Sequence, residues 1–156
     1  LHRVDRRQRQ MCIRDRCYQP LLEEQLVVIG RRDHPAFAPE LSLEAYQACL
    51  HVAIPDRGGR GSPLEIVLGS AKVQRQVQVF VPNYLSIPLI VAQSDLLGTV
   101  PRYLAEHFCA LLPIRIASLP LLAAPVQVSL IWHRQQQQAP GLQWLRREIA
   151  AIASAP

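Results

Sequence analysis

The sequence predicts an α/β fold with a mostly parallel sheet that is covered by helices. Short apolar segments rich in β-branched residues alternate along the chain with segments whose apolar residues recur every three or four positions. Short links that contain Gly, Pro or Asp separate these segments. Because parallel strands need crossover connections, such alternation indicates parallel strands with helices on the faces of the sheet.

The first half of the chain opens with an expected strand at 21–30, which contains the β-branched run Leu-Val-Val-Ile-Gly. Charged residues and a proline at 31–35 end this strand. A short helix is expected at 43–48 and a buried strand at 49–54.

The next helix start, at Ser62, has clear local chemistry. A Gly-rich turn at 57–61 leads into Ser62, whose hydroxyl can cap the helix. Pro63 stands at the first helical position, where no N–H is needed, and Glu65 can reach back to the cap. The helix is expected to end near Gly69.

The second half of the chain begins with a strand at 74–81, in which polar and apolar residues alternate. Asn83 is expected to cap a helix at 84–93 that is apolar nearly all round and should therefore be buried. Pro88 lies inside this helix, where a kink or a loosened first turn is expected.

The last third of the chain is expected to contain three strands and two helices. The strands are predicted at 96–100, 114–119 and 126–133, and Pro101 opens a helix that runs to about Cys109. The final helix, at 140–153, has an apolar face suited to packing, made of Leu142, Leu145, Ile149 and Ile152.

The net charge of +5 is concentrated at the N-terminus. Residues 1–20 hold six Arg and two Asp, a balance of +4, and the other 136 residues hold eleven basic and ten acidic side chains, a balance of +1. Basic runs can bind phosphate, but the run at 7–16, RQRQMCIRDR, resembles translated sequencing-adapter read-through. Residues 1–20 are therefore expected to be a non-native or disordered leader.

The four cysteines, Cys12, Cys17, Cys49 and Cys109, fit no common zinc-ligand spacing, and the last two are expected to be buried free thiols. No metal or cofactor is expected. The longest apolar run, 85–92, is far shorter than the roughly 20 residues that span a bilayer. With no secretory signal either, a cytoplasmic protein without membrane contact is expected.

Several segments, in this order and spacing, resemble the effector-binding domain of LysR-type transcriptional regulators, closest to the branch with nodulation and aromatic-degradation regulators. They are 24–29 (EQLVVI) with 32–35 (RDHP), 41–43 (LSL) with Tyr46, 51–53 (HVA), 81–83 (VPN), 94–101 (SDLLGTVP), and Trp132-His133 with Pro140 and 144–146 (WLR). The resemblance covers about residues 21–153.

The resemblance implies a periplasmic-binding-protein-like (type 2) fold, with two α/β subdomains around a ligand cleft. The segments 21–30 and 124–133 would be the crossover strands and 31–122 a complete second subdomain. The first subdomain would be partial, with 140–153 as its terminal helix. The family's DNA-binding domain is absent from this chain, so DNA contact is expected only through that missing domain. The resemblance also implies a small-molecule effector and a homo-oligomeric parent protein.

The effector-binding residues expected from the resemblance are Arg60, Gly61, Ser62, Asn83, Tyr84, Thr99 and Pro101. The helix starts at Ser62 and Asn83 would offer free N–H donors to an anion. Arg60, beside Gly61 in the Gly-rich turn, would bind a carboxylate, and Tyr84 would stack on an aromatic ligand. Each of these residues also has a purely structural interpretation. Ser62 and Asn83 could serve only as helix caps, Arg60 could be a solvated surface residue, and Tyr84 could be part of the core.

Thr99 and Pro101 match a family motif near the hinge, and they could equally serve only the end of a strand and the start of a helix. His34 and His51 also match the family pattern. We interpret His34 as a turn residue and His51 as a strand residue with a hydrogen-bonded ring, and neither as catalytic.

An enzyme is not expected, because the sequence contains no nucleophile elbow, phosphate loop or dinucleotide fingerprint. The leading interpretation is a ligand-sensing domain for a small anionic or aromatic effector. A fragment of a periplasmic-type solute-binding protein is the alternative, and an α/β enzyme is a weaker one.

Overall fold

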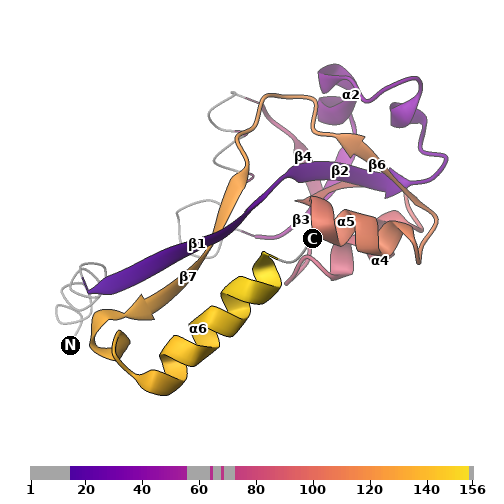
Figure 1. Ribbon diagram of the computed structural model, residues 1–156. Helices are drawn as coiled ribbons and strands as arrows, with labels where there is room; N and C mark the ends of the chain where they lie inside the picture. Colours follow the sequence, from indigo (N-terminus) through magenta and orange to yellow (C-terminus); the bar gives the residue numbers. More distant parts are fainter. Residues whose placement is uncertain (1–14, 56–63, 65–67, 69–72, 155–156) are drawn as a thin grey trace, which may run out of the picture. The chain divides into compact units, whose positions relative to one another are not determined.

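The computed structural model describes residues 15–55, 64, 68 and 73–154, and it divides the chain into two compact units (Figure 1). One unit is continuous, Glu24–Val126. The other combines the two ends of the chain, Leu1–Glu23 and Gln127–Pro156.

A five-stranded mixed sheet forms the centre of the continuous unit, with strand order β4-β3-β5-β2-β6. β3 pairs in parallel with β4 and β5, whereas β2 is antiparallel to both β5 and β6. Four strands share one direction, but β2 is reversed and makes two of the four pairings antiparallel, so the sheet is mixed where a mostly parallel one was predicted. The strands are β2 (Leu26–Arg31), β3 (Leu50–Ala53), β4 (Gln76–Phe80), β5 (Leu96–Pro101) and β6 (Ile114–Ser118).

The helices of this unit begin close to where local chemistry places them. They are the 3-10 helix η1 (Pro35–Phe37), α2 (Leu43–Ala48), α4 (Ser86–Val91) and α5 (Arg102–Cys109). The bounds of α2 are as predicted, and Ser42 caps it by accepting a hydrogen bond from the backbone N–H of Ala45 at 3.1 Å. α5 begins directly after Pro101, which also confirms the expected helix start there.

The prediction that the helix at 84–93 is buried all round is wrong. α4 is shorter, and although Ile87, Pro88 and Val91 are buried, Leu85 is 59% exposed and Leu89 52% exposed. One face of α4 packs on the sheet while the other has no described cover. Pro88 occupies the third helical position, where its missing N–H removes no hydrogen bond within the helix.

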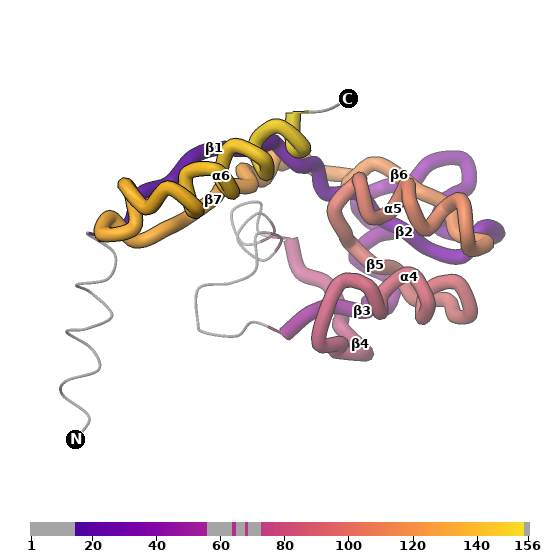
Figure 2. The backbone as a smooth tube through the Cα atoms, turned by 60° about the horizontal axis from the view of Figure 1, so that its bottom comes forward, coloured from indigo at the N-terminus to yellow at the C-terminus, as the bar shows by residue number. Residues whose placement is uncertain are grey.

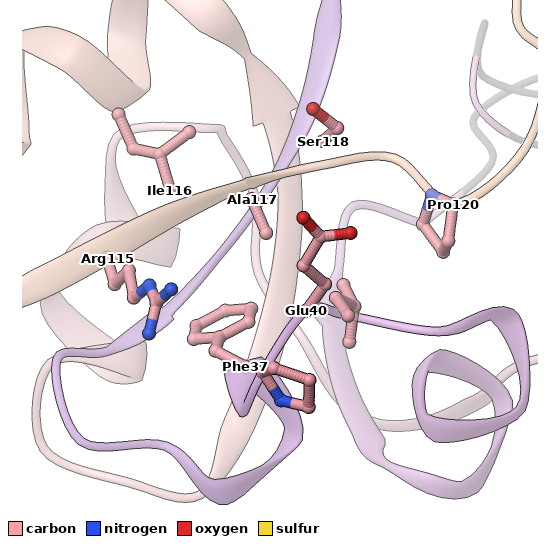
Figure 3. A pocket seen from close by; sticks show the side chains of 9 residues that line it. Phe37, Glu40, Arg115, Ile116, Ala117, Ser118 and Pro120 are labelled. Carbon is pink, nitrogen blue, oxygen red and sulfur yellow. The ribbon is translucent and has the colours of Figure 1, made fainter.

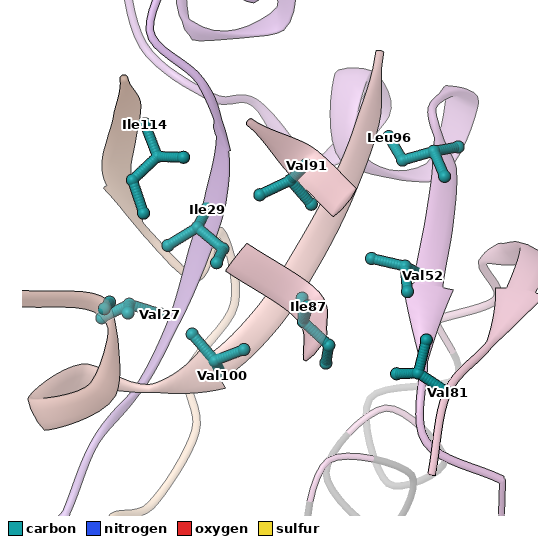
Figure 4. Close-up of a cluster of buried hydrophobic side chains, with 10 residues drawn as sticks. Val27, Ile29, Val52, Val81, Ile87, Val91, Leu96, Val100 and Ile114 are labelled. Carbon is teal, nitrogen blue, oxygen red and sulfur yellow. The ribbon is translucent and has the colours of Figure 1, made fainter. Parts of the chain in front are cut away.

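Alternate residues of each strand enter two separate cores on the two faces of the sheet. Val27 and Ile29 point to the side covered by α4 and α5, where they join Val52, Val81, Ile87, Val91, Leu96, Val100, Ala105 and Ile114 (Figure 4). Val28 points to the other side, together with Phe37, Leu41, Tyr46, Leu64, Leu68 and Leu97. The two-residue period of the strands thus buries both faces of the sheet.

Gly98 of β5 lies directly against Ile87 of α4. A Cβ atom on Gly98 would lie 2.3 Å from Cγ2 of Ile87, well inside van der Waals contact. The helix can therefore rest on β5 only because residue 98 has no side chain. This explains in physical terms the glycine within the motif at 94–101.

The unit built from the chain ends contains β1 (Arg16–Glu24), β7 (Val126–His133), the short helix η2 (Arg134–Gln136) and α6 (Pro140–Ala153). β1 and β7 form a two-stranded sheet and run side by side in both views (Figures 1 and 2). The backbone N–H of Arg134 donates to the carbonyl of Asp15 at 2.7 Å, and the Gln127 amide donates to the carbonyl of Leu22 at 2.9 Å. This pattern is typical of antiparallel pairing.

Two boundaries of the predicted segments need correction. The single strand expected at 21–30 is two strands, β1 and β2, which are separated by Gln25. β1 already begins at Arg16, so the expected limit of the leader at residue 20 is too late. Residues 16–20 are part of a strand because they pair with β7. This pairing is a long-range effect that the local sequence does not show.

The bounds of α6 are as predicted, and a stacked pair holds it to β7. The guanidinium carbon of Arg146 lies 4.5 Å from the ring centroid of Trp132, and Arg146 also donates to the carbonyl of Gln137 at 2.9 Å. No residue of α6 is buried, and Trp144 and Ile152 are 61% and 74% exposed. None of the helices described has the length and apolar content needed to cross a membrane.

Candidate functional site

Three parallel strands bring several of the predicted site residues to one edge of the five-stranded sheet. β3, β4 and β5 run in the same direction, so their carboxyl ends lie at a common edge. Asn83 and Tyr84 follow β4, and Pro101 ends β5. Arg60, Gly61 and Ser62, which follow β3 in the sequence, lie outside the described residues.

Asn83 lies just before α4, where its side chain makes the hydrogen bonds expected of a cap, although the helix begins only at Ser86 and Leu85 occupies the N-cap position. Its side-chain oxygen accepts hydrogen bonds from the backbone N–H of Ser86 at 3.2 Å and from the Ser86 hydroxyl at 3.1 Å. The residue is exposed, and among the described residues its side-chain nitrogen has no hydrogen-bond partner. The Asn83 amide can therefore donate to a ligand at this edge without giving up its cap.

Tyr84 is half-buried and packs against the core on the α4 side of the sheet. Burial raises the pKa of its hydroxyl above the ordinary value, so it is a neutral hydrogen-bonding group at physiological pH. The ring contributes to the core, and part of the residue remains accessible at the edge.

Thr99 is placed in the core on the opposite face of the sheet. It is 3% exposed, and its Oγ1 lies 3.1 Å from the hydroxyl of Tyr46. A ligand at the sheet edge does not meet this side chain. Pro101 is half-buried, and the residue after it, Arg102, donates its backbone N–H to the carbonyl of Gln25 at 2.7 Å.

Arg102 is a site residue that the sequence patterns did not single out. It lines a cavity of about 260 Å³ at the edge where β2 begins and where β5 and β6 end, together with Gln25, Leu26, Ser118, Leu119, Leu121, Leu122, Ala123, Ala124 and Pro125. Its Nε donates to Oε1 of Gln25 at 3.2 Å, and Glu106 lies 3.7 Å away on the next turn of α5. The only feature of the sequence that pointed to Arg102 was the predicted start of a helix at Pro101, directly before it.

The two histidines have the structural positions predicted for them. His34 caps η1 by accepting from the backbone N–H of Ala36 at 3.1 Å, and its Nε2 lies 3.1 Å from the carbonyl of Asp95. His51 is fully buried in β3, and its Nε2 donates to the carbonyl of Tyr46 at 2.7 Å. Desolvation lowers the pKa of His51 to about 4, so the ring is neutral at physiological pH.

The described residues contain no group of three or more His, Cys, Asp or Glu side chains that could hold a metal ion. Cys17, Cys49 and Cys109 are free thiols and each is half-buried. Burial raises the pKa of the Cys49 thiol, which leaves it a weak nucleophile. The edge of the sheet thus offers hydrogen-bond donors and a guanidinium, which suit the binding of an anion.

Most of the chain matches a known protein family. Residues 14–153 match the family model described as LysR substrate binding domain. The chain is 34% identical over 137 residues to the HTH-type transcriptional regulator SyrM 1 of Sinorhizobium fredii, covering 86% of this chain and 40% of that protein. It is 28% identical to nodulation protein D 2 of Rhizobium tropici, covering 86% and 43%. The chain therefore spans less than half the length of these relatives.

Solved structures show the same fold. The probable transcriptional regulator PA0477 from Pseudomonas aeruginosa aligns with a TM-score of 0.77 at 24% identity, covering 86% of this chain and 45% of that one. The effector binding domain of QuiR, solved in complex with shikimate, aligns with a TM-score of 0.72 at 15% identity, covering 90% and 66%. Full-length CbnR, solved with its target DNA, aligns with a TM-score of 0.69 at 19% identity, covering 90% and 50%.

Proposed function

Because the chain belongs to the family of LysR substrate-binding domains, we propose that it is the effector-sensing part of a bacterial transcriptional regulator. The SyrM proteins among the relatives that it matches are HTH-type transcriptional regulators. Their greater length leaves room for a separate DNA-binding part. The proposal is therefore a sensor that acts on transcription through other segments of its parent protein, and not an enzyme.

The observation that carries this proposal is the cavity that Arg102 lines at the carboxyl ends of β5 and β6. Asn83 follows β4, and Arg102 lines the cavity of about 260 Å³ at the ends of β5 and β6. Ligands of open α/β sheets bind outside the carboxyl ends of parallel strands. A guanidinium and an amide N–H favour a carboxylate, and the QuiR domain of the same fold was solved with shikimate, a small carboxylate. We therefore propose a small carboxylate effector, aromatic or cyclic in character.

We further propose that the effector acts by shifting an equilibrium of the parent protein between two arrangements. Such a shift requires that the effector bind one arrangement more tightly than the other. DNA contact is assigned to the parent's other segments, by analogy with full-length CbnR, which was solved on its target DNA. A homo-oligomer, a dimer or tetramer, is the proposed state in which the parent binds DNA.

A binding experiment on the chain tests the effector site. Shikimate, benzoate and salicylate are titrated into the protein by calorimetry, alongside their uncharged amides or esters. The carboxylates should bind, and Arg102→Gln and Asn83→Ala should each weaken binding by about tenfold, the loss expected for one hydrogen bond to a charged group. Arg147→Gln, on the exposed surface of α6, is the matched control and should leave the affinity unchanged.

Equal affinity of both variants and the original chain would contradict the placement of the site. Binding of none of the carboxylates would contradict the proposed effector class. Turnover of any of them would contradict the sensor proposal and favour an enzyme.

A further inference from the structure

We propose that the continuous unit holds a second small-molecule site, which binds a zwitterion such as an apolar α-amino acid. The site is a cavity of about 360 Å³ between β6 and the loop that joins η1 to α2. Its size falls in the range of roughly 300–1,000 Å³ that is typical of small-ligand pockets. It is lined by Phe37, Pro39, Glu40, Leu41, Arg115, Ile116, Ala117, Ser118 and Pro120 (Figure 3).

Two buried side chains, Phe37 and Leu41, hold the loop wall of this cavity in place. Phe37 is 1% exposed and packs over Gly30, where a Cβ atom would lie 3.0 Å from the phenylalanine ring. Leu41, at the other end of the loop, is also buried in the core on that face of the sheet. The facing wall is β6, which is held in register along β2. A cavity between two anchored walls is preformed, which reduces the entropic cost of binding a ligand.

Two opposite charges line this cavity without neutralising each other. Figure 3 shows the Arg115 guanidinium and the Glu40 carboxylate to either side of the Phe37 ring. The Arg115 guanidinium carbon lies 5.8 Å from the centroid of that ring. Neither charged group has an ion-pair partner within 4.0 Å among the described residues. A ligand with both a carboxylate and an ammonium group would pair with Arg115 and Glu40 at once.

The rest of the lining selects for an apolar body between these two charged groups. Phe37, Pro39 and Leu41 come from the loop, and Ile116 and Ala117 from β6. A free amino acid with a branched or aromatic side chain has this combination of two opposite charges and an apolar group. A cavity of about 360 Å³ has room for a small molecule of this kind.

The cavity borders the proposed effector site but has its own charged groups. Ser118 contributes to the walls of both cavities, whereas Arg115 and Glu40 line only this one and Arg102 lines only the other. Binding at the two sites can therefore be separated by variants, and this inference does not rest on the proposed effector.

The test is an NMR titration of the ¹⁵N-labelled chain with L-leucine and L-phenylalanine, each beside its N-acetyl derivative and its carboxamide. The free amino acids should shift the amide signals of Ala117 and Ser118 saturably. Each derivative has lost one of the two charges, so it should bind at least about tenfold more weakly.

Variants then assign each charge to its partner. Arg115→Gln and Glu40→Gln should each weaken binding of the free amino acids by at least about tenfold, while Arg102→Gln and the control Arg147→Gln should not. In Glu40→Gln, the N-acetyl derivative should bind as well as the free amino acid, because the ammonium has lost its partner. Circular dichroism establishes that each variant is folded.

Absence of saturable shifts with every free amino acid would overturn the proposal. So would affinity that is unaffected by both Arg115→Gln and Glu40→Gln. Shifts confined to Gln25 and Arg102 would assign the amino acid to the effector cavity and would equally overturn a second site.

Discussion

The hydroxyl of Tyr46 lies 3.1 Å from Oγ1 of Thr99, and both side chains are buried on the face of the sheet opposite α4. The pair connects α2 to β5 through a hydrogen bond inside an apolar core. A buried hydroxyl that loses its partner keeps its desolvation penalty, so this contact should be sensitive to the removal of either oxygen.

A double-mutant cycle measures this contact directly. Tyr46→Phe and Thr99→Val should each lower the free energy of unfolding by about 1–3 kcal/mol, because each removes the hydrogen bond between the two buried hydroxyl groups. The double variant should lose less than the sum, with a coupling of about 1 kcal/mol. Urea denaturation followed by circular dichroism gives the four values, and strict additivity would show that the two hydroxyls do not interact.

Gly98→Ala should be one of the most damaging single-methyl additions in the chain. The new Cβ would meet Ile87 at 2.3 Å, so α4 must move away from β5, at a cost of about 1–3 kcal/mol. Gly141→Ala in α6 is the matched control, because a Cβ there has no neighbour within 4 Å and alanine favours the helix. Equal unfolding free energies for the two variants would contradict the close packing of α4.

Lowering the pH should destabilise the protein through His51. Its pKa is about 4 in the folded state, against an ordinary value of 6.5, so only the unfolded chain takes up the proton between these values. The associated stability, on the order of 3 kcal/mol, is fully present above pH 6.5 and is lost as pH falls toward 4. Urea denaturation at a series of pH values measures this loss.

In His51→Gln, the free energy of unfolding should depend less on pH between 6.5 and 4, even though the substitution also lowers stability at neutral pH. His107→Gln, on the exposed side of α5, should leave the slope unchanged. An unaltered slope in His51→Gln would assign the pH dependence to other groups.

The exposed pair Arg31–Asp95 should be visible in a carboxyl titration. Arg31 Nε donates to Oδ1 of Asp95 at 2.5 Å, and this hydrogen bond lowers the pKa of the carboxyl. In Arg31→Gln the pKa of Asp95 should rise toward its ordinary value, as followed by NMR of the side-chain carboxyl. The stability that this carboxyl contributes is fully present above its ordinary pKa of 3.8 and is lost as the pH falls through the lower pKa of the folded state. An unchanged pKa of Asp95 in the variant would exclude Arg31 as the cause.

Local chemistry predicted much of the fold because several elements carry their own start and stop residues. Ser42 before α2, Pro101 before α5 and Pro140 at the start of α6 each act within one turn of the residue concerned. The sequence around these residues was therefore sufficient to place those helices.

Long-range effects account for what the sequence patterns missed. The β-branched residues of β2 are buried on both faces of the sheet. Such a run has the same pattern whether the strand is parallel or antiparallel to its neighbours, so its direction could not be predicted. Pairing with β7 extends β1 back to Arg16, before the strand start at residue 21 that the sequence pattern predicted. The candidate site behaves in the same way. Asn83 was predicted from its local sequence, whereas Arg102 becomes a lining residue only because the ends of β5 and β6 meet the start of β2.

The reversed strand β2 has a consequence for how the chain acquires its structure on the ribosome. Val27, near the start of the continuous unit, pairs with Val100 and with Ser118, which are both synthesised much later. β2 therefore stays unpaired until β5 and β6 have been synthesised. Pairing between residues so distant in sequence slows folding, and in the meantime the strand edges are exposed to other nascent chains. Fast synthesis and early chaperone contact should therefore matter more for this protein than for one whose neighbouring strands follow one another along the chain.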